Sequence, residues 1–370
     1  MNKKILLFTT LIGLTFLVGC SRAEHKVPLE EIGLAGIMAF DYIDENKVQL
    51  SVAIPQHSPG AKASTQVFSV PTELLSKGIV DIEALSDKKI LFNQLRVVLI
   101  NEEFARKGRV ERMIQHLYRN PEPGNKVLIA IVKGSSEELI NADYPNKPDI
   151  NYYINDLLLP TINTAFNPNT NIHDFIYTAT NPVFDPLLPI IEKKDDKLEI
   201  TGVALFKNNN MFETLTPEEA FIIQDLIGKK KLAPLSVELN QGHGKESLML
   251  ERVKSRVKMK SNKNIKSPKL TISLFYKGTL VEYTGEREND LHSPESLSKL
   301  EKDINKQVEE EVKKTLNKLK ELKVDPIGLS ENFRMYYDGK WTKEMTEENI
   351  SKLEVDIQVK TSIISTGTLD

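Results

Sequence analysis

The side chains that most often carry catalysis or hold metals are few and scattered in this sequence. The 370 residues contain one cysteine and six histidines, and no two histidines have the i, i+4 spacing with glutamate that zinc hydrolases use. A single cysteine also excludes a disulfide framework and cysteine-rich zinc or iron–sulfur sites. We therefore expect no metal ligands and no cofactor.

Two short motifs have both a chemical and a structural interpretation. The segment 242–245 (GHGK) is similar to the end of a phosphate-binding loop, but Leu239 stands where that loop needs glycine and Glu246 where it needs serine or threonine. We interpret it as a flexible glycine turn. Asp195 and Asp196 are flanked by lysines, which is typical of a solvated hairpin tip. Because no nucleophile elbow or dinucleotide-binding glycine pattern occurs either, we expect no catalytic residues and no enzyme activity.

The N-terminus has the features of an export leader. Lys3 and Lys4 precede an apolar run from Ile5 to Val18, and its length of about 14 residues is short for a bilayer span, which needs roughly 20. The run ends in Leu-Val-Gly-Cys, which resembles the lipobox of bacterial lipoproteins. This resemblance implies that residues 1–19 are a signal peptide and that Cys20 carries a diacylglyceryl group. The alternative is an ordinary export signal followed by a free thiol.

Composition limits the class of the rest of the chain. With 40% apolar and 27% charged residues the chain should fold, and its length suggests two or three domains. The formal charge is −3, and removal of the leader's two lysines makes it −5. A protein that coats nucleic acid through general basicity is therefore excluded.

The first segment, residues 20–186, is predicted to be an α/β domain with a mixed sheet. A turn-rich stretch between two β-branched runs, Ile32 to Phe40 and Val48 to Ile54, predicts a hairpin. The continuous apolar runs Arg96 to Ile100 and Val127 to Val132 predict buried strands, and helical spacing between them indicates a right-handed βαβ unit. A second helical stretch is predicted for 150–162.

Proline density predicts a boundary after this segment. Pro182, Pro186 and Pro189 fall within nine residues, which is typical of a stiff linker. Residues 187–235 are then expected to form a small middle domain, a β-hairpin plus a helix. That helix should begin at Thr216, with a proline and two acids in its first turn.

The last segment, 236–370, is predicted to be an α+β domain. Long strands with period-two alternation are followed by a helix over 294–322, about 43 Å long, and by a closing strand near Val355. The apolar stripe of this helix should cover a mostly antiparallel sheet. The fold class expected for the whole chain is therefore α+β, with three domains of mixed sheets and helices.

Two features of this last segment allow a second interpretation. Arg252, Lys254, Arg256, Lys258 and Lys260 alternate along one strand and either face an acidic lipid or protein surface or form a solvated outer face. The long helix either packs on its own sheet or docks on a partner or a membrane. We favour the solvated face and the intramolecular packing.

Several blocks in a fixed order together carry a resemblance that runs over nearly all of the mature chain. The first block is the lipobox with the Ile-rich strand that follows it. The others are RVVLINEEFARKG (96–108), LYRN (117–120), VKG (132–134), ITGVALFK (200–207), LTPEE (215–219), DPIGL (325–329), Trp341 and 357–367. In this order the chain resembles the Ger(x)C family, the lipoprotein C subunits of the nutrient germinant receptors of bacterial spores.

The resemblance implies a three-domain lipoprotein of unusual fold that lies on the outer face of the spore inner membrane. It implies two integral-membrane partner subunits, a requirement in nutrient-triggered germination, and no catalytic residues, so that Cys20 is the one functional residue carried over. The chain would act as a non-enzymatic scaffold held at the membrane by its lipid. The alternative from another class is an extracytoplasmic solute-binding lipoprotein that delivers a small nutrient to a transporter.

Overall fold

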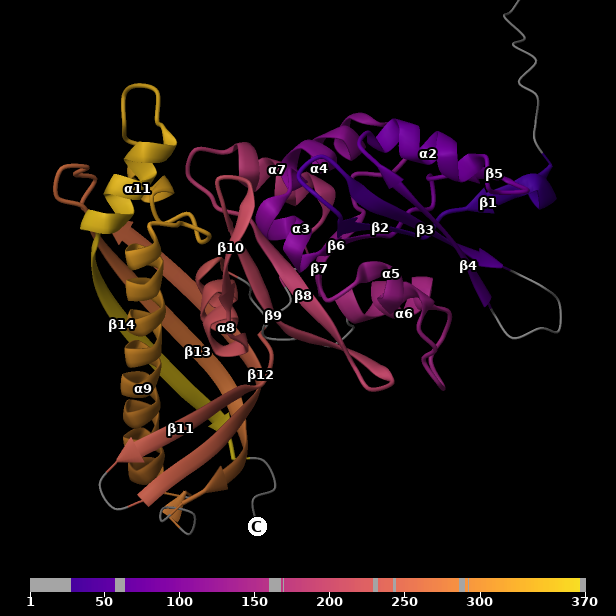
Figure 1. Cartoon of the computed structure of the whole chain (residues 1–370). Helices are drawn as coiled ribbons and strands as arrows, with labels where there is room; N and C mark the ends of the chain where they lie inside the picture. The colour runs from indigo at the N-terminus through magenta and orange to yellow at the C-terminus, as the bar shows by residue number, and fades with distance from the viewer. Residues whose placement is uncertain are drawn as a thin grey trace, which may run out of the picture.

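The computed structural model of the chain describes residues 28–56, 64–159, 168, 170–228, 232–241, 244–285, 290–291 and 293–366. Figure 1 shows a large sheet with helices on both of its faces and a smaller sheet that lies against one long helix. Helix α8 (Pro217–Leu226) lies between these two parts. The α+β fold class predicted from the sequence is confirmed.

The larger sheet has eight strands in the order β10-β9-β8-β7-β6-β2-β3-β4. The four central strands run parallel to one another, and each flank adds two antiparallel strands. The central strands are almost wholly apolar because parallel strands covered on both faces bury side chains on both sides. The eight strands are β2 (Ile37–Tyr42), β3 (Val48–Gln56), β4 (Ser64–Thr72), β6 (Val97–Asn101), β7 (Leu128–Lys133), β8 (Leu187–Lys194), β9 (Lys197–Lys207) and β10 (Asn210–Leu215).

Helices cover both faces of this sheet and give it two hydrophobic cores. One core lies beneath α2 (Leu75–Glu83), α3 (Glu102–Lys107), α4 (Val110–Arg119) and α7 (Ile172–Thr180). The other lies beneath α5 (Ser136–Asn141) and α6 (Ile150–Leu158). The helix predicted over 150–162 is present as α6, but it ends at Leu158, with Leu159 as its C-cap. Among the described residues the hydrophobic cores begin at Ala35.

The predicted β-strand, helix, β-strand unit is present as β6, α3, α4 and β7. The two strands are parallel neighbours. The side chain of Asn101 caps α3 by accepting a hydrogen bond from the Phe104 N–H, 2.9 Å away, as the sequence indicates. Gly108 ends this helix, and α4 follows with Val110, Ile114 and Leu117 buried.

The segment expected to be a separate middle domain shares a sheet with the segment before it. β8, β9 and β10 are hydrogen-bonded into the eight-stranded sheet, because β8 pairs with β7 in parallel from Ile190 onward. Pro189 is therefore inside a strand and not in a linker, at a position where β8 does not yet pair with β7. The division at 186 and 187 stays a prediction about domains, but the sheet continues across it.

The smaller sheet has the order β11-β12-β13-β14 and is covered by α9 (Pro294–Leu322), whose bounds match the prediction. Its first three strands are antiparallel, whereas β13 and β14 are parallel. The predicted apolar stripe of α9 packs on this sheet through Leu300, Ile304 and Val308. The strands are β11 (Leu235–Gln241), β12 (Gly244–Ser261), β13 (Lys269–Thr284) and β14 (Glu354–Ser365).

Helix α9 also closes the open edge of this sheet. Glu301, Asn305 and Glu309 accept hydrogen bonds from the backbone N–H groups of Ile363, Thr361 and Val359, at 2.8, 2.7 and 3.1 Å. Every fourth residue of the helix can reach every second residue of the strand, because four helical residues advance about 6 Å and two strand residues about 6.6 Å. The edge strand therefore offers fewer free donors to another chain.

Short elements complete the fold. The 3-10 helix η1 (Leu29–Glu31) leads into β1 (Ile32–Leu34), which pairs in parallel with β5 (Lys89–Leu91) beside the large sheet. The short helix α10 (Glu331–Arg334) and α11 (Lys343–Lys352) lie between α9 and β14 in the chain.

Candidate functional site

The one functional residue that the sequence predicts, Cys20, lies outside the described residues, as does the leader 1–19. Lipid attachment at Cys20 therefore stays a prediction. Within the part of the chain that the structure describes, no helix is both long enough and apolar enough to cross a membrane.

The two motifs weighed for chemistry lie in hairpins. Gly242 and His243 are outside the described residues, and the residues on either side of them, Gln241 and Gly244, pair in the antiparallel strands β11 and β12. A phosphate-binding loop would join a strand to a helix. Asp195 and Asp196 form the two-residue turn between β8 and β9, with Asp195 at φ 53°. No cluster of three His, Cys, Asp or Glu residues suited to a metal occurs in the described ranges.

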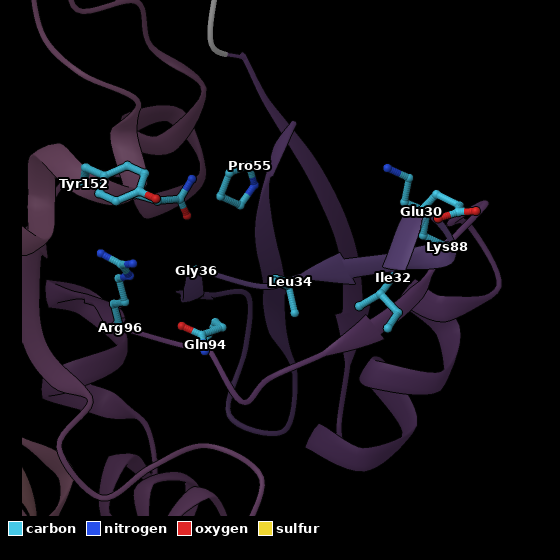
Figure 2. A pocket seen from close by; sticks show the side chains of 10 residues that line it. Glu30, Ile32, Leu34, Gly36, Pro55, Lys88, Gln94, Arg96 and Tyr152 are labelled. Atoms are coloured by element: carbon cyan, nitrogen blue, oxygen red, sulfur yellow. The ribbon is translucent and has the colours of Figure 1, made fainter. Parts of the chain in front are cut away.

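A groove beside β1 is the candidate binding site. It encloses a volume of about 580 Å³ and lies where the described chain begins, between η1 and the start of α6. Figure 2 shows Arg96 and Tyr152 at one end and Glu30 and Lys88 at the other, with Leu34 between them. The remaining lining residues are Ile32, Gly36, Pro55, Gln94 and Asn151.

At the Arg96 end of this groove, a cation stacks on an aromatic ring. The guanidinium carbon of Arg96 lies 4.6 Å from the centroid of the Tyr152 ring, and this contact holds the half-buried cation in place. Among the described residues no carboxylate forms an ion pair with Arg96. A planar guanidinium held in this way can bind a carboxylate or phosphate group through two parallel hydrogen bonds.

A buried amide supports the floor of the groove. The Asn151 side-chain nitrogen donates to the Thr65 hydroxyl at 3.1 Å and to an Asp149 carboxylate oxygen at 2.6 Å. Its oxygen packs against the backbone at Gly36, where an added Cβ would lie only 2.3 Å away. Gly36 is thus required by close packing. The groove can bind a small polar molecule between Arg96 at one end and Glu30 and Lys88 at the other.

A second cluster joins the two parts of the molecule around the fully buried Asp325. Its carboxylate accepts backbone hydrogen bonds from Gly328, Leu329 and Ser330, each at 2.8 Å. Burial raises the pKa of Asp325 to about 6, against the lowering effect of these donors. The turn that follows Asp325 requires glycine at position 328 for two reasons. Gly328 has φ +83°, which side chains rarely allow, and an added Cβ would lie only 2.3 Å from the Phe184 ring.

Asp185 connects this turn to the end of the first segment. One of its carboxylate oxygens accepts the Asp325 N–H at 2.7 Å, and the other pairs with the Lys343 ammonium at 2.7 Å. Burial raises the pKa of Asp185, while Lys343 works in the opposite direction. The Thr346 hydroxyl accepts from the Trp341 indole N–H and donates to the Pro182 carbonyl, at 2.8 and 2.7 Å. We call this cluster of Asp185, Asp325, Lys343, Trp341 and Thr346 the joint.

A third buried carboxylate ties α8 to the smaller sheet. Asp225 accepts hydrogen bonds from the hydroxyl groups of Ser255 on β12 and Tyr276 on β13. Burial raises the pKa of Asp225, and these two donors oppose that effect. Each of the three buried aspartates thus contacts partners from distant parts of the chain, which indicates a structural role.

Sequence reasoning missed both the groove and the joint. The sequence block DPIGL and the lone tryptophan mark the joint, but nothing local shows that Asp185 and Lys343 meet them. The groove has a weaker signal, because Arg96 directly precedes the apolar strand β6. Its partners come from residues that are far apart in the chain, and no spacing rule connects them.

Comparison with known protein families gives two matches that together span most of the chain. Residues 25–193 match the spore germination protein N-terminal domain, and residues 201–367 match the spore germination B3/GerAC-like C-terminal domain. The second match contains the whole smaller sheet, α9 and most of the joint.

Individual proteins match over comparable lengths. The chain is 28% identical to spore germination protein GerQC of Bacillus cereus over 368 residues, which is 100% of each chain. It is 23% identical to spore germination protein B3 of Bacillus subtilis (strain 168) over 360 residues, 92% of this chain and 93% of the other. The crystal structure of the GerBC protein superposes with a TM-score of 0.57 at 19% identity, covering 88% of this chain and 96% of that one, which supports the same fold.

Proposed function

The chain belongs to the spore germination B3/GerAC-like family, and from this membership we propose that it is the lipid-anchored C subunit of a spore germinant receptor. In this proposal it is a non-enzymatic scaffold that lies on the outer face of the spore inner membrane. It acts with two integral-membrane subunits in nutrient-triggered germination. The single observation that carries the proposal is that two family models together span most of the chain, 25–193 and 201–367.

The anchor is the element that this function requires. Cys20 stands just ahead of the first matched residue, 25, at the end of an apolar leader. Two acyl chains on one residue give lasting attachment, whereas one chain binds only marginally. The segment between Cys20 and the start of η1 is short, so the folded body would stay close to the bilayer.

The buried carboxylates favour a scaffold over an enzyme. Asp185, Asp225 and Asp325 are each engaged by backbone or side-chain groups of the fold, and none lines the groove. A catalytic acid or base needs access to a substrate, which these groups lack.

The decisive experiment is Cys20→Ala in the full chain. We expect a folded protein whose membrane-bound fraction falls by about tenfold or more, with slower nutrient-triggered germination, because the lipid supplies the attachment. Mass spectrometry of the wild-type N-terminal peptide should find the diacylglyceryl group on Cys20. Ser21→Ala is the matched control and should leave attachment unchanged. A Cys20→Ala protein that stays membrane-bound and germinates normally would overturn the proposal.

The alternative of a solute-binding lipoprotein has one observation in its favour, the groove with Arg96, which forms no ion pair with any described residue. Against it, such proteins close two α/β lobes around a hinge, and the smaller sheet with α9 is not a second lobe of that kind. Titration calorimetry of the chain from Ser21 onward with amino acids and sugars separates the two proposals. Micromolar or tighter binding that Arg96→Ala abolishes would favour the alternative.

A further inference from the structure

One face of the smaller sheet is open and strongly basic. The opposite face packs beneath α9 through buried residues such as Leu270, Ile272 and Leu274. Alternate residues of the strands therefore point away from the helix. We call this outer surface the basic face; its exposed cations are Lys254, Arg256, Lys258 and Lys260 on β12, Lys277 on β13 and Lys360 on β14.

The pairing register brings these cations together around an aromatic ring. Phe275 on β13 lies opposite Arg256 on one side and opposite Lys360 on the other. The Lys258 ammonium lies 5.8 Å from the centroid of the same ring. Phe275 is 38% exposed, so an apolar ring lies open to solvent at the centre of the cations.

Carboxylates are fewer than cations on these strands. The exposed acids are Glu251 on β12, Glu282 on β13 and Glu354 and Asp356 on β14, and Asp356 already accepts a hydrogen bond from Gln358 at 3.0 Å. Within the described ranges, none of the six cations forms an ion pair. The Lys269–Glu354 pair, at 2.7 Å, lies at the end of the face. A protein whose mature formal charge is −5 thus concentrates positive charge on one surface.

The structure also refines the strand pattern seen in the sequence. Arg252 falls in a bulge of β12 with φ 53°, where the register with β13 shifts between Glu251 and Lys254. The regular cationic series therefore begins at Lys254. Across the sheet Lys254 lies opposite Lys277, and like charges in such a pair are unfavourable for sheet stability.

A face that only needed to be solvated would not require charges of one sign. The outer side of α9 is such a face, and there Lys302, Lys306, Lys313 and Lys314 are mixed with Glu310 and further acids. Lysines that only prevent strand addition belong at an edge. At the β14 edge the helix already serves this purpose through Glu301, Asn305 and Glu309. The excess of cations around Phe275 on the basic face therefore favours a partner of opposite charge.

We propose that the basic face binds the anionic headgroups of a membrane surface, with Phe275 at headgroup level. An extended sheet face with cations about 6.6 Å apart along one strand suits many headgroups at once, whereas a small ligand would need a cavity. The proposal rests on the membrane attachment proposed above, which would place the folded body beside a bilayer. Attraction of basic segments to anionic lipids is well suited to such a surface.

The test is co-sedimentation of the chain from Ser21 onward, which lacks the lipid anchor and keeps every described core residue. We expect binding to phosphatidylcholine vesicles that contain phosphatidylglycerol, no binding to pure phosphatidylcholine, and weaker binding as salt rises. The variant K254Q/R256Q/K258Q/K260Q should weaken binding on the order of 100-fold. Failure of the unaltered chain to bind the anionic vesicles would overturn the proposal, whether or not an acidic protein binds the face.

The matched control removes the same number of charges from α9. The variant K302Q/K306Q/K313Q/K314Q should bind the anionic vesicles as the unaltered chain does, and equal losses in both variants would overturn the proposal. K277Q/K360Q provides a second test on other strands and should weaken binding by about tenfold even if the β12 variant folds poorly. Because no sample contains Cys20, failure here leaves the anchoring proposal standing, and that proposal fails only in the Cys20→Ala experiment.

Discussion

Asp325 is the residue on which the joint depends. It is fully buried, and its carboxylate organises the turn from Gly328 to Ser330 by accepting three backbone N–H groups. We therefore expect that no other residue can replace aspartate at this position. No other side chain combines the same reach with two oxygens that both accept.

The pH dependence of stability should reveal this carboxyl group. Burial raises the pKa of Asp325 to about 6 in the folded chain, above the ordinary value of 3.8. Between these values the folded chain binds more protons than the unfolded chain, so this group makes the protein more stable as pH falls. Compared with Asp325→Asn, the wild type should gain about 1 kcal/mol in unfolding free energy from pH 7 to pH 5.

Urea unfolding of both proteins at the two pH values measures this difference. The Asp225 and Asp185 carboxyl groups are present in both proteins, so the comparison isolates Asp325. The unfolding free energy of the wild type, relative to that of Asp325→Asn, should rise from pH 7 to pH 5. If this relative free energy stays constant or falls on acidification, the pKa of Asp325 is not raised.

At the scale of elements, the smaller sheet is held on two sides by one helix. The apolar stripe of α9 covers a face, and its polar residues Glu301, Asn305 and Glu309 bind the edge strand β14. The middle bond of this edge contact joins Asn305 to the N–H of the buried Thr361.

Asn305→Leu should therefore destabilise the chain by about 1–2 kcal/mol, because it leaves the Thr361 N–H buried without an acceptor. Asn317→Leu is the matched control, since Asn317 is an exposed residue of the same helix. Thermal and urea unfolding compare the two variants, and size-exclusion chromatography checks whether the freed edge promotes self-association. Equal stability of the two variants would show that the edge contact contributes little.

At the scale of the whole molecule, the joint connects two differently built parts through buried polar contacts. Lys343 and Asp325 from the C-terminal part hold Asp185, which precedes β8 of the large sheet. The single tryptophan, Trp341, is buried in the same cluster and reports on it directly.

Lys343→Ala should uncouple the two parts, because the buried Asp185 carboxylate loses its cation, at a cost of about 2–3 kcal/mol. In the wild type, Trp341 fluorescence and far-UV circular dichroism should report one coincident urea transition. In Lys343→Ala the fluorescence transition should come first. The double variant Asp185→Asn/Lys343→Met removes both charges and should recover part of the loss. Coincident transitions in Lys343→Ala would mean that the ion pair does not couple the parts.

Local patterns in the sequence were sufficient wherever neighbours along the chain decide the structure. The bounds of α9, the cap at Asn101, the capped start of α8 and the hairpin at Asp195 all depend on residues a few positions apart. Turn residues, caps and hydrophobic periodicity act over that range, so they can be read without knowledge of the fold.

The sequence by itself therefore determined the central strands, the helices α8 and α9, the α+β class and the family resemblance, together with the prediction of a lipid anchor at Cys20. Only the tertiary structure decided that β8 to β10 complete the first sheet, that Asp185 and Asp325 meet in a joint, and that cations from three strands share one face. The physical reason is that these features come from contacts between residues far apart in the chain, such as Asp185 and Asp325, 140 positions apart, and Pro182 and Thr346, 164 positions apart. Such contacts are fixed by the packing of whole elements, and no periodicity along the chain encodes them.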